Sequence, residues 1–252
     1  MTGAPLLEVR GLRAGYGASV VLEDLDFHMD VEAVGIVGRN GMGKTTLCDT
    51  LVGFLSPSGG QVLLRGERID GRSPERIARA GIAYVPQGRR LFPSLTVEEH
   101  LAMLSRRGRR WTPFRVYELF PRLAERKRQR GGHLSGGEQQ MLAVGRALLL
   151  DADLIVMDEP SEGLAPAVVD VLVDAVHHLV AEGVAVLVVE QNLRAAVRMA
   201  PRQLVMVSGR IEAEFAGAEL RDRPDLQHRY LGVGAGDGTV RSDSDRTGTT
   251  DA

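Results

Sequence analysis

The chain has 252 residues, of which 44% are hydrophobic and 25% are charged. These values are ordinary for globular proteins and exclude collagen-like, coiled-coil and wholly disordered classes. The 31 Lys and Arg against 33 Asp and Glu give a formal net charge of −2, which excludes a chain-wide polycation for nucleic acid.

Short segments of alternating apolar and polar residues dominate the first quarter of the chain, a pattern typical of half-buried strands. Two of them flank the turn Gly15-Tyr16-Gly17, which predicts that they pair as neighbours. A continuous apolar run between glycines predicts a buried strand, and a helix is expected after it. The predicted strands are Leu6–Ala14, Val20–Asp30, Ala33–Val37 and Gln61–Arg65, and the predicted helix is Lys44–Phe54.

The segment from Arg106 to Arg130 has ten basic residues, two acidic residues and few β-branched side chains. It is expected to belong to a helical lobe with a solvated basic face. Further along, the apolar strands Leu154–Met157 and Val184–Val189 flank a predicted helix, Ala167–Ala181, and residues 204–215 predict a hairpin. Strands that alternate with helices imply an α/β fold with a largely parallel sheet.

The segment from Gly38 to Thr45 reads GRNGMGKT and fits the pattern GxxxxGK[ST]. Glycines let backbone N–H groups converge on phosphate oxygens, and the following helix directs its positive end at the same anion. Lys44 would add a charge on the β- and γ-phosphates, and the Thr45 hydroxyl would bind Mg²⁺. The strand before the loop and the helix after it disfavour a glycine-rich turn that binds nothing. The expected nucleotide-binding residues are Gly38, Arg39, Asn40, Gly41, Met42, Gly43, Lys44, Thr45 and Thr46.

Two adjacent carboxylates, Asp158 and Glu159, follow the apolar strand Leu154–Met157, which is the Walker B pattern. At the tip of a central strand, Asp158 is expected to hold Mg²⁺ through water, and Glu159 to orient or deprotonate the attacking water. Paired carboxylates also occur in plain surface turns, but the phosphate loop upstream favours the catalytic interpretation.

The sequence Leu134-Ser135-Gly136-Gly137-Glu138 stands between these two motifs and precedes a predicted helix, Gln139–Leu150. In that position it resembles the signature motif of ATP-binding-cassette (ABC) ATPases, and the resemblance extends over residues 6–232. It implies a P-loop NTPase fold of the ABC type, with a RecA-like α/β core, an N-terminal antiparallel β subdomain and an inserted helical lobe at about 90–140. Residues 1–232 would form this single domain, with Ser135, Gly136 and Gly137 facing ATP on a second subunit.

The resemblance also assigns roles outside these motifs. Tyr16 would stack on adenine, although a partly buried core tyrosine is the alternative. Gln87 would reach Mg²⁺ and the attacking water. Gln191 stands where many relatives have a histidine that contacts the γ-phosphate; its amide can donate a hydrogen bond but cannot carry a proton. Ala165 replaces an aspartate that many relatives have in the D-loop.

Several segments resemble the ATPases of branched-chain amino acid importers, in particular the F-type subunit. They are Tyr84–Val97, Leu119–Leu123, Leu134–Met141, Glu159–Pro166 and Val189–Asn192. The resemblance implies a cytoplasmic ATPase on the inner face of the cell membrane, with ATP and Mg²⁺ as cofactors. The implied partners are a second ATPase subunit, identical or different, membrane permease subunits and an extracytoplasmic solute-binding protein, with no nucleic acid.

Two alternatives stay open at this point. The ATPase of urea-type importers is similar and shares Gln87. A soluble ABC ATPase that acts on nucleic acid or on a protein assembly would use the basic stretch, where Arg109-Arg110-Trp111 combines charge with an aromatic ring. Such relatives usually have two cassettes or a long coiled-coil insertion, and neither is visible here. The same basic stretch would also suit an anionic membrane surface.

The remaining features concern location and order. The one cysteine, Cys48, is expected to be a small core residue, which favours a reducing compartment. No signal peptide is visible in the first ten residues, and no charge-free apolar run approaches the roughly 18 residues that span a bilayer. Residues 233–252 have too few apolar side chains to repay ordering and are expected to form a disordered tail. The histidines, expected at the surface or in caps rather than as metal ligands, are His28, His100, His133, His177, His178 and His228.

Overall fold

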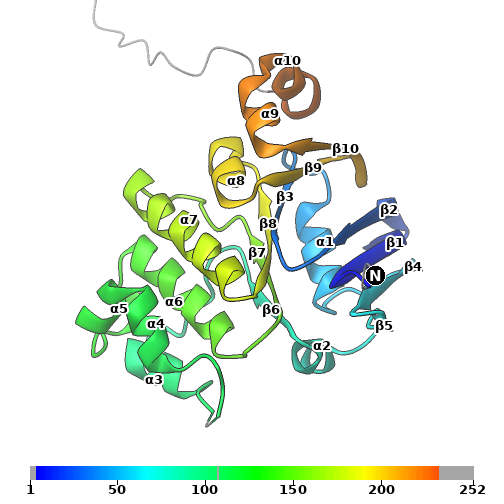
Figure 1. The fold of residues 1–252 in the computed structure, drawn as a ribbon. Helices are drawn as coiled ribbons and strands as arrows, with labels where there is room; N and C mark the ends of the chain where they lie inside the picture. The colour runs from blue at the N-terminus through cyan, green and yellow to red at the C-terminus, as the bar shows by residue number, and fades with distance from the viewer. Residues whose placement is uncertain (1–3, 107, 233–252) are drawn as a thin grey trace, which may run out of the picture.

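The computed structural model describes residues 4–106 and 108–232, so the predicted tail 233–252 lies outside the described residues. At its centre is a six-stranded sheet in the order β10-β9-β3-β8-β7-β6 (Figure 1). All neighbours in it are parallel except the β9–β10 hairpin, which confirms the predicted largely parallel sheet. The strands are β3 (Ala33–Val37), β6 (Ile82–Val85), β7 (Leu154–Asp158), β8 (Ala185–Glu190), β9 (Arg202–Val207) and β10 (Arg210–Ala216).

Each face of this sheet is covered by a separate hydrophobic cluster, because alternate residues of a strand point to opposite faces. Leu154 and Val156 of β7 pack with α1 (Lys44–Leu51), whereas Ile155 and Met157 pack with α6 (Gly136–Leu148) and α7 (Pro166–Ala181). Every residue of β3, β7 and β8 is buried. The tips of these strands are therefore rigid supports for the loops that follow them.

A second, four-stranded antiparallel sheet packs over α1, in the order β2-β1-β4-β5. It contains the predicted pair of N-terminal strands and the predicted strand near residue 61. Its members are β1 (Leu7–Tyr16), β2 (Ser19–Met29), β4 (Gly59–Leu64) and β5 (Glu67–Arg68). Cys48 lies fully buried between the two sheets, as expected for a core residue, and burial raises the pKa of its thiol well above the usual range.

Short helices make up the segment between β6 and β7, on the side of α6 and α7 (Figure 1). They are α3 (Val97–Ala102), α4 (Pro113–Leu119), α5 (Pro121–Glu125) and η1 (Gly131–His133), followed by the long helix α6. The remaining helices are α2 (Pro74–Ala80), α8 (Leu193–Met199), α9 (Gly217–Asp222), α10 (Pro224–Leu226) and η2 (Gln227–Leu231). Among the helices of residues 4–106 and 108–232, none combines the length and the hydropathy needed to span a bilayer.

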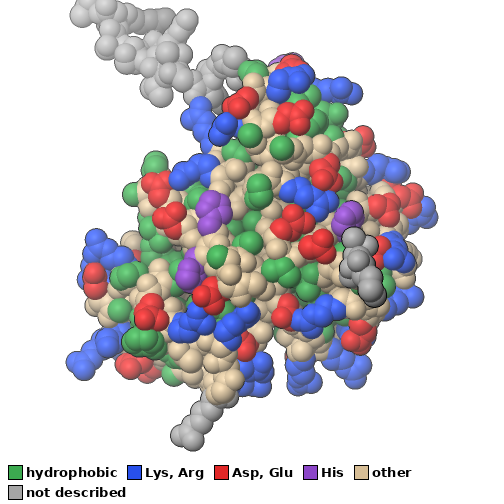
Figure 2. Space-filling view, in the orientation of Figure 1, with side chains coloured by type: hydrophobic (Ala, Val, Ile, Leu, Met, Phe, Trp, Pro, Cys, Tyr) green, Lys and Arg blue, Asp and Glu red, His purple; other side chains and the backbone are tan. Residues whose placement is uncertain are grey.

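The basic stretch is bound into the fold more closely than expected. Trp111 is only 2% exposed, so its ring is not available to stack on a base. The Arg115 guanidinium lies 4.6 Å from the centre of that ring and pairs with Glu182 at 2.9 Å. Arg110 pairs with Asp151. Over the face shown in Figure 2, Lys and Arg side chains are interspersed with Asp and Glu.

His100 corrects one expectation, because it is 1% exposed rather than a surface or cap residue. Its Nδ1 lies 2.8 Å from the Thr96 carbonyl oxygen, which can only accept, so Nδ1 carries the proton. Its Nε2 accepts the Phe92 backbone N–H at 3.1 Å. Both ring nitrogens therefore have partners inside the fold, and burial lowers the pKa of His100.

Candidate functional site

The glycine-rich loop lies between β3 and α1 and is wedged against neighbouring strands. Gly41 and Gly43 have φ angles of +79° and +100°, values at which other residues would be strained. A Cβ at Gly38 would lie 2.6 Å from the Met206 carbonyl oxygen, and one at Gly43 would lie 3.1 Å from Leu22. The close approach of these neighbours leaves no room for a larger residue at Gly38. The loop ends at the N-terminus of α1, where backbone N–H groups have no helical partners.

Lys44 fills this loop with its own ammonium group. Its Nζ donates to the carbonyl oxygens of Gly38 at 2.9 Å and Arg39 at 3.2 Å, and the side chain is 5% exposed. The same Nζ lies 3.4 Å from a carboxylate oxygen of Glu159. Phosphate oxygens carry more negative charge than the carbonyl oxygens that now accept from Nζ, so Lys44 would bind them more strongly.

Asp158 ends β7 and is 1% exposed. Its Oδ2 accepts a hydrogen bond from the Tyr84 hydroxyl at 3.3 Å, while its buried Oδ1 has no partner among the described residues. Burial raises the pKa of Asp158, against the influence of the neighbouring Thr45 hydroxyl. An orphaned carboxylate oxygen beside a hydroxyl is a donor set that suits Mg²⁺, which prefers oxygen ligands.

Glu159 follows in the left-handed region, with a φ of +48°. Such a conformation costs about 1–3 kcal/mol and persists only when neighbouring groups hold it. The Glu159 N–H donates to the Val189 carbonyl oxygen of β8 at 2.8 Å. Its carboxylate lies 3.4 Å from Nε2 of Gln87, which also donates to Glu162 at 3.0 Å. The Glu159 carboxylate therefore contacts both Lys44 and Gln87.

Gln191 lies immediately after β8 and is exposed. Its neighbour Asn192 accepts the Ala195 N–H and so caps α8. The preceding residue, Glu190, is 2% exposed and accepts backbone N–H groups from Ser161 at 2.8 Å and Asn192 at 3.2 Å. Burial raises the pKa of Glu190. This carboxylate connects the loop after Glu159 with the loop that carries Gln191, a role that sequence analysis missed.

Tyr16 does not fit the alternative of a core tyrosine, because it is 53% exposed. Its hydroxyl donates to Asp49 of α1 at 3.3 Å. An exposed ring is thus held beside the helix that follows the phosphate loop.

The predicted signature residues lie elsewhere, at the N-terminus of α6. Ser135 and Glu138 form a capping box, in which each side chain accepts the other residue's backbone N–H. A Cβ at Gly136 would lie 3.1 Å from the Arg89 guanidinium, and one at Gly137 would lie 2.7 Å from Val168. The predicted site residues therefore form two groups, one around Lys44 and Asp158 and the other at this helix end.

Comparisons with known proteins agree with this geometry. The family model described as ABC transporter matches residues 22–162. The chain is 43% identical over 222 residues to the high-affinity branched-chain amino acid transport ATP-binding protein BraG of Pseudomonas aeruginosa, covering 86% of this chain and 95% of the relative. It is 32% identical over 234 residues to the probable branched-chain amino acid transport ATP-binding protein LivF of Archaeoglobus fulgidus, covering 90% and 99%. A nucleotide-free ATP-binding cassette from an ABC transporter superposes with a TM-score of 0.80 at 25% identity, covering 91% of this chain and 99% of that one.

Proposed function

The chain belongs to the ABC transporter family, whose ATP-binding subunits hydrolyse ATP to drive transport, and we propose that it serves an importer of branched-chain amino acids. The contacts that bring Lys44, Glu159 and Gln87 together beside the orphaned oxygen of Asp158 carry the catalytic part of this proposal. The similarity to BraG and LivF over most of the chain supports branched-chain amino acids as the transported solute.

Each residue of the Lys44 group has a definite task. ATP and Mg²⁺, when bound, supply the phosphoryl group and the positive charge beside it. Lys44 would exchange its two carbonyl partners for oxygens of the β- and γ-phosphates, and the Thr45 hydroxyl and Asp158 would hold the metal. Glu159, fixed by the backbone of β8, orients the attacking water and accepts its proton. Gln87, whose amide lies beside the Glu159 carboxylate, would help to align that water.

The second group of site residues is the basis for proposing a dimer of ATPase subunits. Ser135, Gly136 and Gly137 start a helix of 13 residues, whose N-terminus favours an anion. The Arg89 guanidinium stands beside them. Within one chain these groups contact Arg89, Glu138 and Val168 rather than Lys44, so a second subunit would present them to the γ-phosphate.

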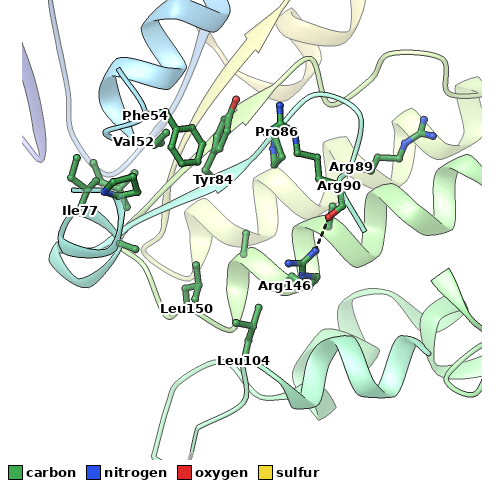
Figure 3. A pocket seen from close by; sticks show the side chains of 15 residues that line it. Val52, Phe54, Ile77, Tyr84, Pro86, Arg89, Arg90, Leu104, Arg146 and Leu150 are labelled. Atoms are coloured by element: carbon green, nitrogen blue, oxygen red, sulfur yellow. Dashed lines mark hydrogen bonds between the residues drawn. The ribbon is translucent and has the colours of Figure 1, made fainter. Parts of the chain in front are cut away.

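An apolar groove lined by α2, β6, α6 and the loops beside them supports the proposal of a permease partner (Figure 3). It has a volume of about 290 Å³ and runs between α2, β6 and α6. Phe54, 58% exposed, stands at its edge. Three arginines line the groove, Arg89, Arg90 and Arg146, and no acidic side chain of residues 4–106 or 108–232 lines it. A permease segment with apolar side chains and flanking carboxylates would match this groove in shape and charge.

The other candidates have less support. The buried ring of Trp111 and the ion pairs of Arg110 and Arg115 remove the main argument for nucleic acid. Residues of the site do not separate urea from branched-chain amino acids, because the solute is bound by other subunits.

Reconstitution tests the proposal. Proteoliposomes that contain this chain with its permease subunits and ATP, supplied with the binding protein, are expected to take up labelled leucine but not labelled urea. The Glu159→Gln variant is expected to abolish uptake while it still binds ATP. Uptake of urea instead would favour the urea-type alternative, and ATP hydrolysis stimulated by nucleic acid without any uptake would refute the transport function.

A further inference from the structure

Tyr84 belongs to the groove and to the catalytic site at once. Its ring lines the groove and meets the Phe54 ring edge-on, with centroids 6.1 Å apart and planes at 69°. In Figure 3 the Tyr84 hydroxyl points away from Leu104 and Leu150. That hydroxyl donates to Oδ2 of Asp158 at 3.3 Å. A single side chain therefore has apolar neighbours at one end and the Walker B carboxylate at the other.

The hydrogen bond is long enough to respond to small movements of the ring. Donor–acceptor distances for hydroxyl bonds cluster near 2.7–2.8 Å, and a bond at about 3.3 Å is close to its limit. Tyr84 is half-buried and packs against Phe54, an exposed residue that an occupant of the groove would touch. A shift of a few tenths of an ångström at Phe54 would therefore shorten or break the bond to Asp158.

Asp158 depends on this bond for its orientation. Its Oδ1 has no hydrogen-bond partner among the described residues, and the Tyr84 hydroxyl donates to Oδ2, so Tyr84 and the neighbouring Thr45 hydroxyl together hold the carboxylate plane. A carboxylate fixed in this way needs no reorientation when the metal binds. Without the hydroxyl, the carboxylate could rotate about its terminal torsion, which has a broad minimum.

From this geometry we infer that Tyr84 is a positioning residue that couples occupation of the groove to metal binding by Asp158. An occupant that presses on Phe54 moves the Tyr84 ring, and the hydroxyl transmits that movement to the metal-binding carboxylate. The identity of the occupant as a permease segment rests on the proposed function, but the link from Phe54 to Asp158 does not.

Removal of one oxygen atom tests the link. Tyr84→Phe keeps the ring in the groove and deletes the donor. The measurement is equilibrium dialysis of a non-hydrolysable ATP analogue, with Mg²⁺ and with a chelator. In Mg²⁺ the Kd of Tyr84→Phe is expected to rise about fivefold, as for loss of one long hydrogen bond of ordinary strength. In the chelator it is expected to match that of the wild type.

Tyr117→Phe is the matched control, because the buried Tyr117 hydroxyl has no partner among the described residues. Its Kd is expected to stay at the wild-type value in both conditions. Equal Kd values for Tyr84→Phe and wild type in Mg²⁺ would overturn the inference. So would an equal rise with and without Mg²⁺, since that would reflect a general distortion of the nucleotide site.

The groove end of the link is tested by a double-mutant cycle with Phe54→Leu. This variant is expected to raise the Kd in Mg²⁺ about twofold, and the double variant is expected to be no weaker than Tyr84→Phe alone. Additive effects would overturn the coupling between Phe54 and Tyr84. These measurements use the isolated full-length chain, so they stand even if the permease or its solute is assigned wrongly.

Measurements on the transporter assembled with its permease distinguish failure of the proposed coupling from failure of the proposed function. If assembly with the permease changes the Kd in Mg²⁺ for wild type but not for Tyr84→Phe, the coupling serves the proposed partner. If assembly changes both equally, the coupling is overturned, whereas leucine uptake by the wild-type transporter would still support the proposed function.

Discussion

Replacement of Glu190 probes how the catalytic loops are held, because one buried carboxylate accepts N–H groups from two of them. Glu190→Gln keeps the volume and one oxygen but presents an NH₂ group to the second donor. Either the Ser161 N–H or the Asn192 N–H then loses its acceptor. We expect the loop after Glu159, the loop of Gln191, or both, to leave their catalytic positions for part of the time.

The size of the effect follows from burial. A buried N–H that loses its acceptor costs about 1–3 kcal/mol, and about 1.4 kcal/mol corresponds to a factor of ten in rate. Burial, and to a smaller extent repulsion from Glu159, raises the pKa of Glu190. Replacing Glu190 with the neutral Gln removes this unfavourable charge, which offsets part of the cost. We therefore expect kcat to fall about five- to thirtyfold, with the KM for ATP unchanged.

The assay is steady-state ATP hydrolysis by the assembled transporter. Glu182→Gln is the matched control, because Glu182 is an exposed carboxylate paired with Arg115 on the far end of α7. Its kcat should stay within twofold of wild type. If Glu190→Gln also stays within twofold, or if its KM for ATP rises as steeply as its kcat falls, Glu190 does not position the catalytic loops.

Two further predictions concern other residues of the site, and a third concerns the buried His100. Lys44→Ala should lose ATP affinity in equilibrium dialysis, whereas Glu159→Gln should bind ATP normally and hydrolyse almost none; the reverse pattern would exchange their roles. Gln191→Ala should lower the transporter's kcat by roughly one to two orders of magnitude, as for one hydrogen bond to a charged group, and Gln191→His should add a pH dependence near neutrality; unchanged kcat for the alanine variant would leave Gln191 as a strand-end residue. Since burial lowers the pKa of His100, its neutral form stabilises the fold above about pH 6.5, and this contribution is lost as the pH falls. The difference in unfolding free energy between wild type and His100→Asn should narrow from pH 7 to pH 5, and a constant difference would contradict the neutral, doubly hydrogen-bonded imidazole.

The sequence predicts three buried strands of the central sheet to within a residue, but it predicts no strand at β6 and starts β9 two residues late. Continuous apolar runs identify β3 at its observed bounds, and β7 and β8 nearly so, because a strand buried on both faces has no polar position to blur its ends. Helix ends are less well predicted. The helix expected to reach Phe54 stops at Leu51, since Gly53 takes a φ of +83° that starts the next turn. The five-residue helix η2 carries too few residues for a periodic signal.

The site divides in the same way. The residues of the phosphate loop are contiguous in sequence, and so are the two Walker B carboxylates, so each motif indicates its chemistry by itself. Tyr84 and Glu190 act through partners 74 and 29 residues away, and only the folded sheet brings them together. His100 looked like a surface residue because its two partners are backbone groups, Thr96 and Phe92, which a sequence pattern does not reveal.

The order of strands explains why these missed residues matter. β7 lies between β6 and β8, and its tip carries both catalytic carboxylates. From β6, the Tyr84 hydroxyl holds Asp158; from β8, the Val189 carbonyl holds the strained backbone of Glu159 and Glu190 holds Ser161. Under the proposed coupling, a movement in the groove would reach the site from β6, and a movement at Gln191 would reach it from β8. Because the two routes end on the adjacent residues Asp158 and Glu159 at the end of β7, the proposed metal-binding and water-activating carboxylates would respond to different partners while staying in fixed relation to each other.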